Sequence, residues 1–99
     1  MNTKKHGTEE LEKDFGPLSF GNALESFRSG EDMTQKEFAK FLGITPQSLC
    51  DLEKCRRIPS PGRAAKTAKK LGEPEAFWVQ LALQDTLRKE ELELTVSVA

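Results

Sequence analysis

The basic side chains of this chain gather in its middle. Residues 34–70 hold nine Lys and Arg against three acidic residues, a net charge of +6, whereas residues 1–33 carry a net −3 and residues 71–99 a net −4. The formal charge of −1 for the whole chain therefore conceals a basic segment between two acidic ones. Because binding to phosphates requires a local basic patch, this pattern indicates recognition of a polyanion.

Within this segment, a predicted helix over residues 46–54 carries polar side chains on one face, and we call it the reading helix. At about 100° per residue, the side that must pack on preceding helices carries Ser48, Leu49 and Leu52. The outward face is formed by Pro46, Gln47, Cys50, Asp51 and Lys54. Such a face is suited to the edges of bases in a DNA groove.

Gln47 is the strongest candidate for reading a base on this face. Its amide can donate and accept in one bidentate contact with adenine, worth about 1–3 kcal/mol of discrimination. Asp51, one turn further on, can accept from cytosine N4, and the alternative is a solvated charge that is merely tolerated there. Cys50 is interpreted as a small inert residue or a contact to a thymine methyl.

Contacts to the DNA backbone are expected from helix N-termini and from the basic loop after the reading helix. Gln35 lies in the first turn of another predicted helix, where free N–H groups and the helix dipole attract a phosphate. The cationic candidates are Lys54, Arg56, Arg57 and Arg63. Each has an alternative role as a solvated charge, and about half of such positions are expected to touch DNA.

Two helix-start signals, eleven residues apart, position these side chains. Thr34 and Glu37 have the spacing of a capping box, which begins a helix over QKEFAKFL. Gly43 supplies a left-handed residue that ends it, and Thr45 with Pro46 starts the reading helix. Two short helices joined by a Gly-containing turn form the helix-turn-helix layout, in which the second helix enters a DNA groove.

Three further helices are predicted around this motif, over residues 19–29, 60–71 and 74–89. Arg28 ends the first of them, and Glu53 flanks the buried face of the reading helix. We therefore expect Arg28 and Glu53 to form a structural ion pair.

The C-terminal segment has the pattern of a dimerisation element. In the last predicted helix Trp78 lies on one apolar side, whereas Val79 and Leu83 lie on another, and a helix of this kind is buried twice. After it, four apolar residues alternate with polar ones, as in a half-buried strand, and they are Leu92, Leu94, Val96 and Val98. The strand is expected to pair with its own copy across a two-fold axis, and the alternative is a flexible tail.

Other kinds of chemistry are not indicated. The two cysteines, Cys50 and Cys55, lack CxxC or paired Cys/His spacing, and the single histidine is His6 in a polar tail, so we expect free thiols and no metal. No nucleophile–base pair is evident, so we expect neither enzymatic activity nor a cofactor. Without a signal-peptide layout or a long apolar run, no membrane association is expected, and the predicted location is the cytoplasm, with nucleoid association.

From residue 19 to residue 71 the chain resembles the lambda-repressor-like (Cro, or XRE) helix-turn-helix domains. The residues whose spacing carries the resemblance are Arg28, Gln35, Ala39, Gly43 and Glu53. The resemblance implies a phosphate contact at Gln35 and a structural Arg28–Glu53 pair. It also implies a DNA-facing surface at Thr45, Pro46, Gln47, Ser48 and Asp51.

One residue departs from the pattern of that family. Cys55 stands where the family usually has a Gly that closes the reading helix. The left-handed turn at this position is therefore either strained or replaced by another loop form.

Residues 77–98 resemble the tail of a narrower group, the XRE-type antitoxins of the HigA kind. In that group a DNA-binding dimer represses its own operon and binds a ribosome-dependent endoribonuclease toxin. The resemblance implies double-stranded DNA, a second copy of the chain and a small basic toxin as partners. The alternatives are a stand-alone phage-type or metabolic regulator, and a helix-turn-helix protein-interaction module without DNA affinity, which Asp51 on the reading face favours.

The sequence therefore predicts an all-α fold, a five-helix lambda-repressor-like domain with a C-terminal β-strand used in dimerisation. Residues 1–18 are expected to form a flexible arm that can carry a short helix, residues 19–73 the DNA-binding domain, and residues 74–99 the dimerisation segment. The predicted function is repression of transcription by a dimer on a pseudo-palindromic operator with half-sites about 34 Å apart.

Overall fold

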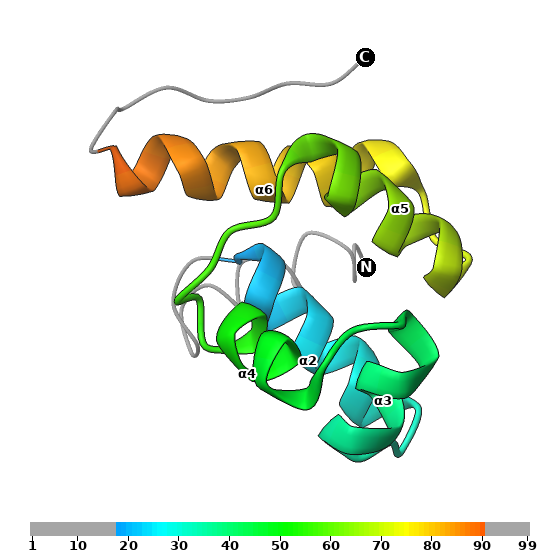
Figure 1. The fold of residues 1–99 in the computed structure, drawn as a ribbon. Coiled ribbons are helices and arrows are strands. Elements are labelled where there is room, and N and C mark those ends of the chain that lie inside the picture. Colours follow the sequence, from blue (N-terminus) through cyan, green and yellow to red (C-terminus); the bar gives the residue numbers. More distant parts are fainter. Residues whose placement is uncertain (1–17, 91–99) are drawn as a thin grey trace, which may run out of the picture.

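The computed structural model describes residues 18–90 of the 99-residue chain. These residues form five helices joined by short connections (Figure 1). The helices are α2 (Phe20–Gly30), α3 (Gln35–Leu42), α4 (Pro46–Glu53), α5 (Pro61–Leu71) and α6 (Glu75–Lys89). The five predicted helices are confirmed, and α4 is the reading helix. None of the five is long and apolar enough to cross a membrane.

The predicted C-terminal strand is not part of this fold. Residues 18–90 contain helices and no strand. The apolar residues assigned to the strand, Leu92, Leu94, Val96 and Val98, lie outside the described residues, as do residues 1–17 of the predicted arm. Alternating apolar residues make a stable strand only where other strands exist to pair with, and residues 18–90 provide none. The fold class is therefore corrected to an all-helical domain.

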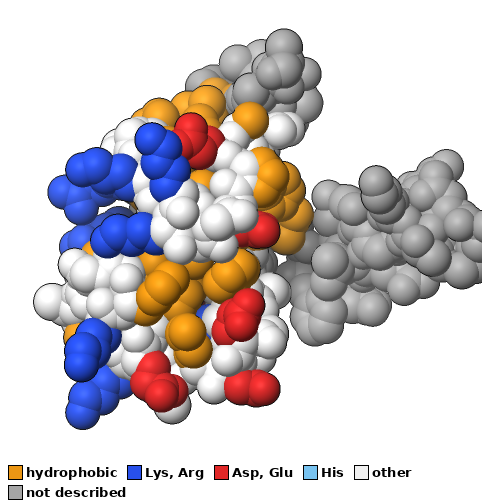
Figure 2. All heavy atoms as spheres, turned by 90° about the vertical axis from the view of Figure 1, so that its right-hand side faces the viewer, with side chains coloured by type: hydrophobic (Ala, Val, Ile, Leu, Met, Phe, Trp, Pro, Cys, Tyr) orange, Lys and Arg blue, Asp and Glu red, His pale blue; other side chains and the backbone are white. Residues whose placement is uncertain are grey.

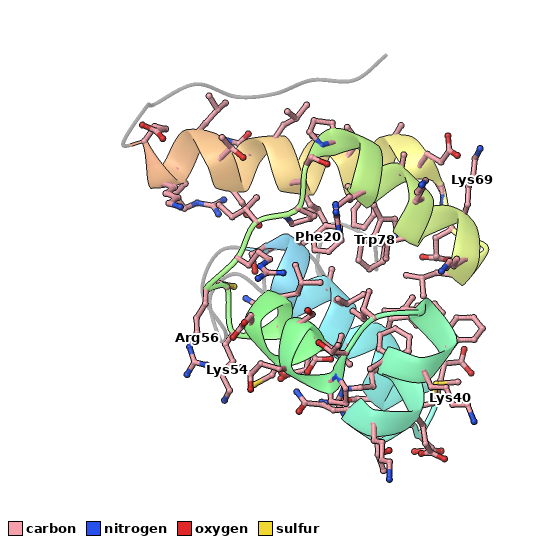
Figure 3. All side chains as sticks on the ribbon, viewed as in Figure 1. Phe20, Lys40, Lys54, Arg56, Lys69 and Trp78 are labelled. Atoms are coloured by element: carbon pink, nitrogen blue, oxygen red, sulfur yellow. The ribbon has the colours of Figure 1, made fainter. Side chains whose placement is uncertain are left out.

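The helices pack in two layers that share one core (Figure 1). α5 packs on α6, while α4 packs on α2 and α3, and α2 also contacts α6. Phe20 of α2 and Trp78 of α6 meet edge to face, with ring centroids 5.4 Å apart (Figure 3). Both side chains are fully buried, together with Leu24, Phe38 and Leu49. α6 therefore shares one core with the helix-turn-helix region.

Local hydrogen bonds explain where most of the helices begin. The hydroxyls of Ser19, Thr34, Thr45 and Ser60 each accept from the backbone N–H three residues further on. At Thr34 the predicted capping box is confirmed, because the Thr34 N–H also donates to Oε1 of Glu37 at 2.9 Å. This hydrogen bond holds the pKa of the Glu37 carboxyl below its ordinary value.

The start of α2 has a second cap that comes from the far end of the chain. Oδ2 of Asp85 in α6 accepts from the Phe20 N–H at 2.9 Å, and Oδ1 accepts from Nη1 of Arg88 at 2.9 Å. Asp85 is buried, so its carboxylate meets the positive end of the α2 dipole away from water. No local pattern marks this residue, which lies 65 positions from Phe20 in the sequence.

α4 ends in a left-handed turn at Cys55, whose φ is 61°. The Cys55 N–H donates to the carbonyl of Leu52 at 3.1 Å, and the Arg56 N–H donates to the carbonyl of Asp51 at 2.9 Å, the pair of bonds that defines a Schellman motif. Of the two alternatives for this position, the strained turn is the one observed. For a residue other than Gly, this conformation costs about 1–2 kcal/mol.

Replacing Cys55 with Gly is expected to stabilise the fold by about 0.5–1 kcal/mol, because relief of the left-handed strain exceeds the added entropy of the unfolded chain. Thermal unfolding should show a Tm about 4 °C higher. Cys55→Ala is the matched control, since it keeps the β-carbon and removes only the thiol, which lies 3.4 Å from the Ser19 hydroxyl. Equal Tm changes in the two variants would contradict the strain argument.

Candidate nucleic-acid interface

A three-residue turn joins α3 to α4 and leaves the start of α4 on the surface. Gly43 takes the predicted left-handed conformation, with φ 75°, and the Ile44 N–H then closes the end of α3. Leu49 of α4 is fully buried, whereas Thr45, Pro46 and Gln47 are exposed and Ser48 is half-buried. The first turn of the reading helix is therefore uncovered while its opposite face holds the motif together.

Two of the predicted base-reading residues, Gln47 and Asp51, are hydrogen-bonded to each other on α4. Nε2 of Gln47 donates to Oδ1 of Asp51 at 3.0 Å, and Nη1 of Arg56 lies 3.6 Å from the same oxygen. Among residues 18–90, no other group bonds to the second N–H or to the oxygen of the Gln47 amide. These two groups are the donor and acceptor pair that an adenine edge requires. Asp51 thus orients Gln47, and Arg56 offsets part of the negative charge that Asp51 brings to this face.

Gln35 lies at the first turn of α3, but its side chain faces inward. Nε2 of Gln35 donates to Oε1 of Glu53 at 2.8 Å, and Gln35 is half-buried. The group at this position that is suited to an anion is the helix end itself, where first-turn N–H groups have no partner within the helix. Any phosphate contact at Gln35 would therefore be made through the backbone.

The four predicted cations, Lys54, Arg56, Arg57 and Arg63, are all exposed. Lys54 and Arg56 project together beyond the end of α4, far from Lys40 on α3 (Figure 3). Seen from the side, Lys and Arg gather along one edge of the molecule, while Asp and Glu lie mostly away from it (Figure 2). This uneven distribution of charge on the surface favours approach of a polyanion from one side.

Two further cations that sequence reasoning did not single out stand beside Arg63 on α5. Lys66 and Lys70 follow Arg63 at spacings of three and seven residues, which places the three on one face of the helix. Nζ of Lys70 donates to the carbonyl of Leu42 at 2.6 Å, at the end of α3. The spacing of the basic residues along this predicted helix could have identified both lysines from the sequence.

Arg28 of α2 and Glu53 of α4 form an ion pair. Nε and Nη2 of Arg28 donate to the two carboxylate oxygens of Glu53 at 2.8 and 3.1 Å. Nη1 of Arg28 also donates to the carbonyl of Met33 at 3.0 Å. Only 1% of the Glu53 side chain is exposed, against 18% for Arg28. The bonds to Glu53 raise the pKa of Arg28 above its ordinary value. The pair ties α2 to α4.

The two α6 residues predicted to form a dimer interface are half-buried. Val79 packs in part against the core of its own chain. Leu83 lies one turn further along α6 and is also half-buried. Both side chains retain exposed surface that a second molecule could cover.

A capped helix, a tight left-handed turn and a second helix with an uncovered polar face, set beside a basic edge, define a helix-turn-helix domain of the DNA-binding class. Comparison with protein families agrees with this geometry, because a family model described as helix-turn-helix matches residues 24–78. The chain belongs to this helix-turn-helix family, of the Cro/XRE, lambda-repressor-like type.

Two curated proteins are similar to about two thirds of this chain. The "Endothelial differentiation-related factor 1 homolog" of Gallus gallus is 35% identical over 65 residues, which is 66% of this chain and 44% of the relative. The protein of the same name from Xenopus laevis matches with the same identity and coverage. The chain thus spans less than half the length of these relatives. No solved structure matches it.

Proposed function

We propose that this protein is a sequence-specific transcriptional repressor that binds a pseudo-palindromic operator as a dimer, with α4 in the major groove. The observation that carries the proposal is the uncovered polar face of α4, where Asp51 holds the amide of Gln47 in place at 3.0 Å. A side chain that is already ordered loses less entropy on binding a base. Gln47 is the main base reader, and Thr45, Pro46, Ser48 and Asp51 border it.

Backbone contacts in this proposal come from both sides of the reading helix. The first turn of α3 supplies N–H groups, and Lys54, Arg56, Arg57 and Arg63 supply charge. Each phosphate contact releases counterions, so affinity falls as salt rises. The half-buried Val79 and Leu83 of α6 are the described residues that support the dimer, and a dimer matches the two-fold symmetry of a pseudo-palindrome.

The finer role that we propose is that of an autoregulating antitoxin. Its support is the resemblance of residues 77–98 to the tails of HigA-type antitoxins, and the net negative charge of the two flanks, which suits a small basic toxin. A reading frame for a small basic protein beside this gene, whose product forms a complex with this chain, is the expected finding. A chain that forms no complex with the product of any neighbouring gene would be a stand-alone regulator.

The DNA-binding proposal is tested by selecting an operator from random duplexes and measuring affinity by fluorescence anisotropy. Gln47→Ala should weaken binding to the selected operator by about 5- to 150-fold and relax the preference at one base pair per half-site. Lys54→Gln should weaken binding to all duplexes and lower the salt slope by about 1. Native mass spectrometry of the complex should give two chains per operator.

Lys40→Gln is the matched control for Lys54→Gln, because it makes the same charge change on α3, far from the end of α4 (Figure 3). Its affinity and salt slope should equal those of the wild type. No enrichment of any sequence, with binding independent of salt, would sink the DNA-binding proposal. It would favour the second candidate, a protein-interaction module, which the carboxylate of Asp51 on the reading face supports.

A further inference from the structure

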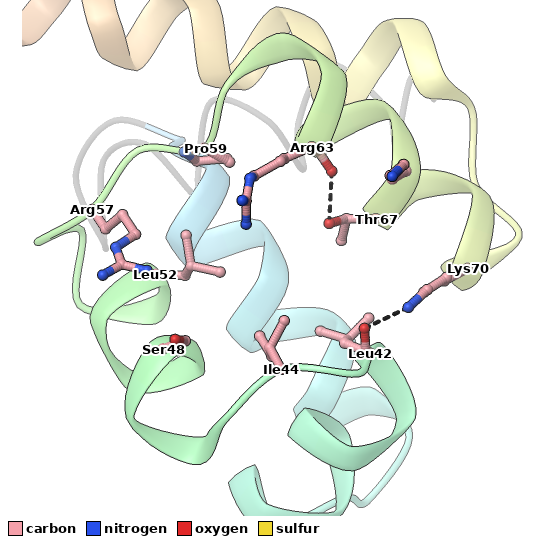
Figure 4. Close-up of a pocket in the computed structure, with 10 residues that line it drawn as sticks. Leu42, Ile44, Ser48, Leu52, Arg57, Pro59, Arg63, Thr67 and Lys70 are labelled. Atoms are coloured by element: carbon pink, nitrogen blue, oxygen red, sulfur yellow. Dashed lines mark hydrogen bonds between the residues drawn. The ribbon is translucent and has the colours of Figure 1, made fainter.

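A cavity of about 170 Å³ lies between α4 and α5. Its apolar floor is made by Leu42, Ile44, Leu52 and Pro59 (Figure 4). Four cations line the same cavity, and they are Arg57, Arg63, Lys66 and Lys70. Arg63 reaches from α5 toward Leu52 and Ile44, so a positive charge stands over the apolar floor (Figure 4).

The charge around this cavity is not balanced by the described part of the chain. Among residues 18–90, no acidic residue lines it, and Arg57, Arg63 and Lys66 form no ion pair. Clustered like charges repel one another, and an anion placed between them relieves that repulsion. The lining therefore favours a negatively charged occupant.

A DNA backbone alone would not satisfy both parts of the lining. A phosphodiester can meet the cations, but it carries no apolar group to fill a cavity floored by Leu, Ile and Pro. An apolar cavity of about 150 Å³ in another protein holds a molecule the size of benzene. The space between α4 and α5 thus has room for one ring or a short branched chain.

We propose that this cavity binds a small organic anion, a carboxylate or phosphate that carries one apolar group of about the size of a ring. The apolar group lies on Leu52 and Ile44, and the anionic head lies among Arg57, Arg63 and Lys66. Because Leu52 belongs to α4, the occupant touches the reading helix from behind. Binding of the anion does not depend on the proposed repressor function, since it is measured without DNA.

The test compares phenyl phosphate, benzoate and inorganic phosphate in titrations followed by heteronuclear NMR at constant ionic strength. Phenyl phosphate should bind at least about tenfold more tightly than inorganic phosphate, because the ring leaves water for the apolar floor. Backbone signals of Ile44 and Thr67 should shift. Comparing the affinity for benzoate with that for phenyl phosphate then shows whether the cations prefer a carboxylate or a phosphate.

Two variants locate the site. Thr67→Met fills the cavity and keeps all four cations, so it should abolish the preference for phenyl phosphate over inorganic phosphate. Lys66→Gln should weaken both ligands and keep the preference. Equal affinities for phenyl phosphate and inorganic phosphate in the wild type, or shifts confined to residues away from the cavity, would overturn the proposal. The wild-type comparison decides even if Thr67→Met fails to fold.

Discussion

Gly21→Ala is expected to destabilise the protein by about 3 kcal/mol or more, because a β-carbon at this position would overlap the backbone of α4. That carbon would lie 2.2 Å from the carbonyl oxygen of Leu52 and 3.1 Å from that of Glu53. Backbone atoms at the end of a packed helix cannot rotate away as a flexible side chain would. α2 must therefore move off α4, which disturbs the contacts of both helices.

The measurement is chemical or thermal unfolding, in which Tm should fall by about 12 °C or more. Gly62→Ala is a closely matched control, because Gly62 is the second residue of α5 as Gly21 is of α2, and its β-carbon would meet nothing within 4 Å. It should leave stability unchanged or raise it by up to about 1 kcal/mol. Similar losses in the two variants would show that close approach to α4 is not the reason for Gly21.

The second large effect is expected at the buried ion pair. Arg28→Met leaves the carboxylate of Glu53 buried, with Gln35 as its one remaining hydrogen-bond partner among residues 18–90. Removing one partner of a buried pair costs about 3–5 kcal/mol. Arg56→Met is the control, because the Arg56 side chain is exposed, its nitrogen lies 3.6 Å from Asp51, and ion pairs at the surface contribute about 0–1 kcal/mol. Urea unfolding at neutral pH measures both.

The double variant Arg28→Met with Glu53→Met separates charge burial from packing. It should be more stable than Arg28→Met alone, because no unpaired charge remains in the core. The fraction of Arg28→Met that stays folded should select the same operator as the wild type, since neither residue reaches the reading face. A double variant that is less stable than Arg28→Met would mean that the methionines fail to pack. A changed operator preference in Arg28→Met would mean that the ion pair determines how α4 is oriented on the DNA.

Much of the helix-turn-helix unit was predictable because its determinants are local. Thr34 and Glu37 hydrogen-bond across three residues, and Thr45 with Pro46 begins α4 within a single turn. The partners Arg28 and Glu53 are distant in sequence, but Glu53 was predicted beside the buried face of the reading helix and Arg28 at the end of the helix that covers it. The prediction of a C-terminal strand as part of the fold was wrong. Alternating apolar and polar residues specify which face of a strand is buried, but they do not supply a neighbouring strand.

The reading face shows the limit of such reasoning within one helix. The spacing of Gln47 and Asp51 placed both on the outer face of α4. Their hydrogen bond, and the approach of Arg56 to Asp51, depend on rotamers and on the turn at Cys55, so Asp51 gained an orienting role that its position alone did not assign. Gln35, in contrast, lost its predicted side-chain role. Its amide faces Glu53, so only the backbone at the helix end remains available to an anion.

The sequence by itself determined where the helices of this protein begin and end, which face of α4 is polar, and that its positive charge lies in the middle of the chain. Caps, turns and helical periodicity involve residues a few positions apart. The interactions behind them are therefore local and do not require the helices to be packed. Only the tertiary structure decided that Asp85 caps α2, that Gly21 must have no side chain, and that four cations surround an apolar cavity. Each of these depends on how separate helices approach one another, and that geometry is set by the core around Phe20 and Trp78.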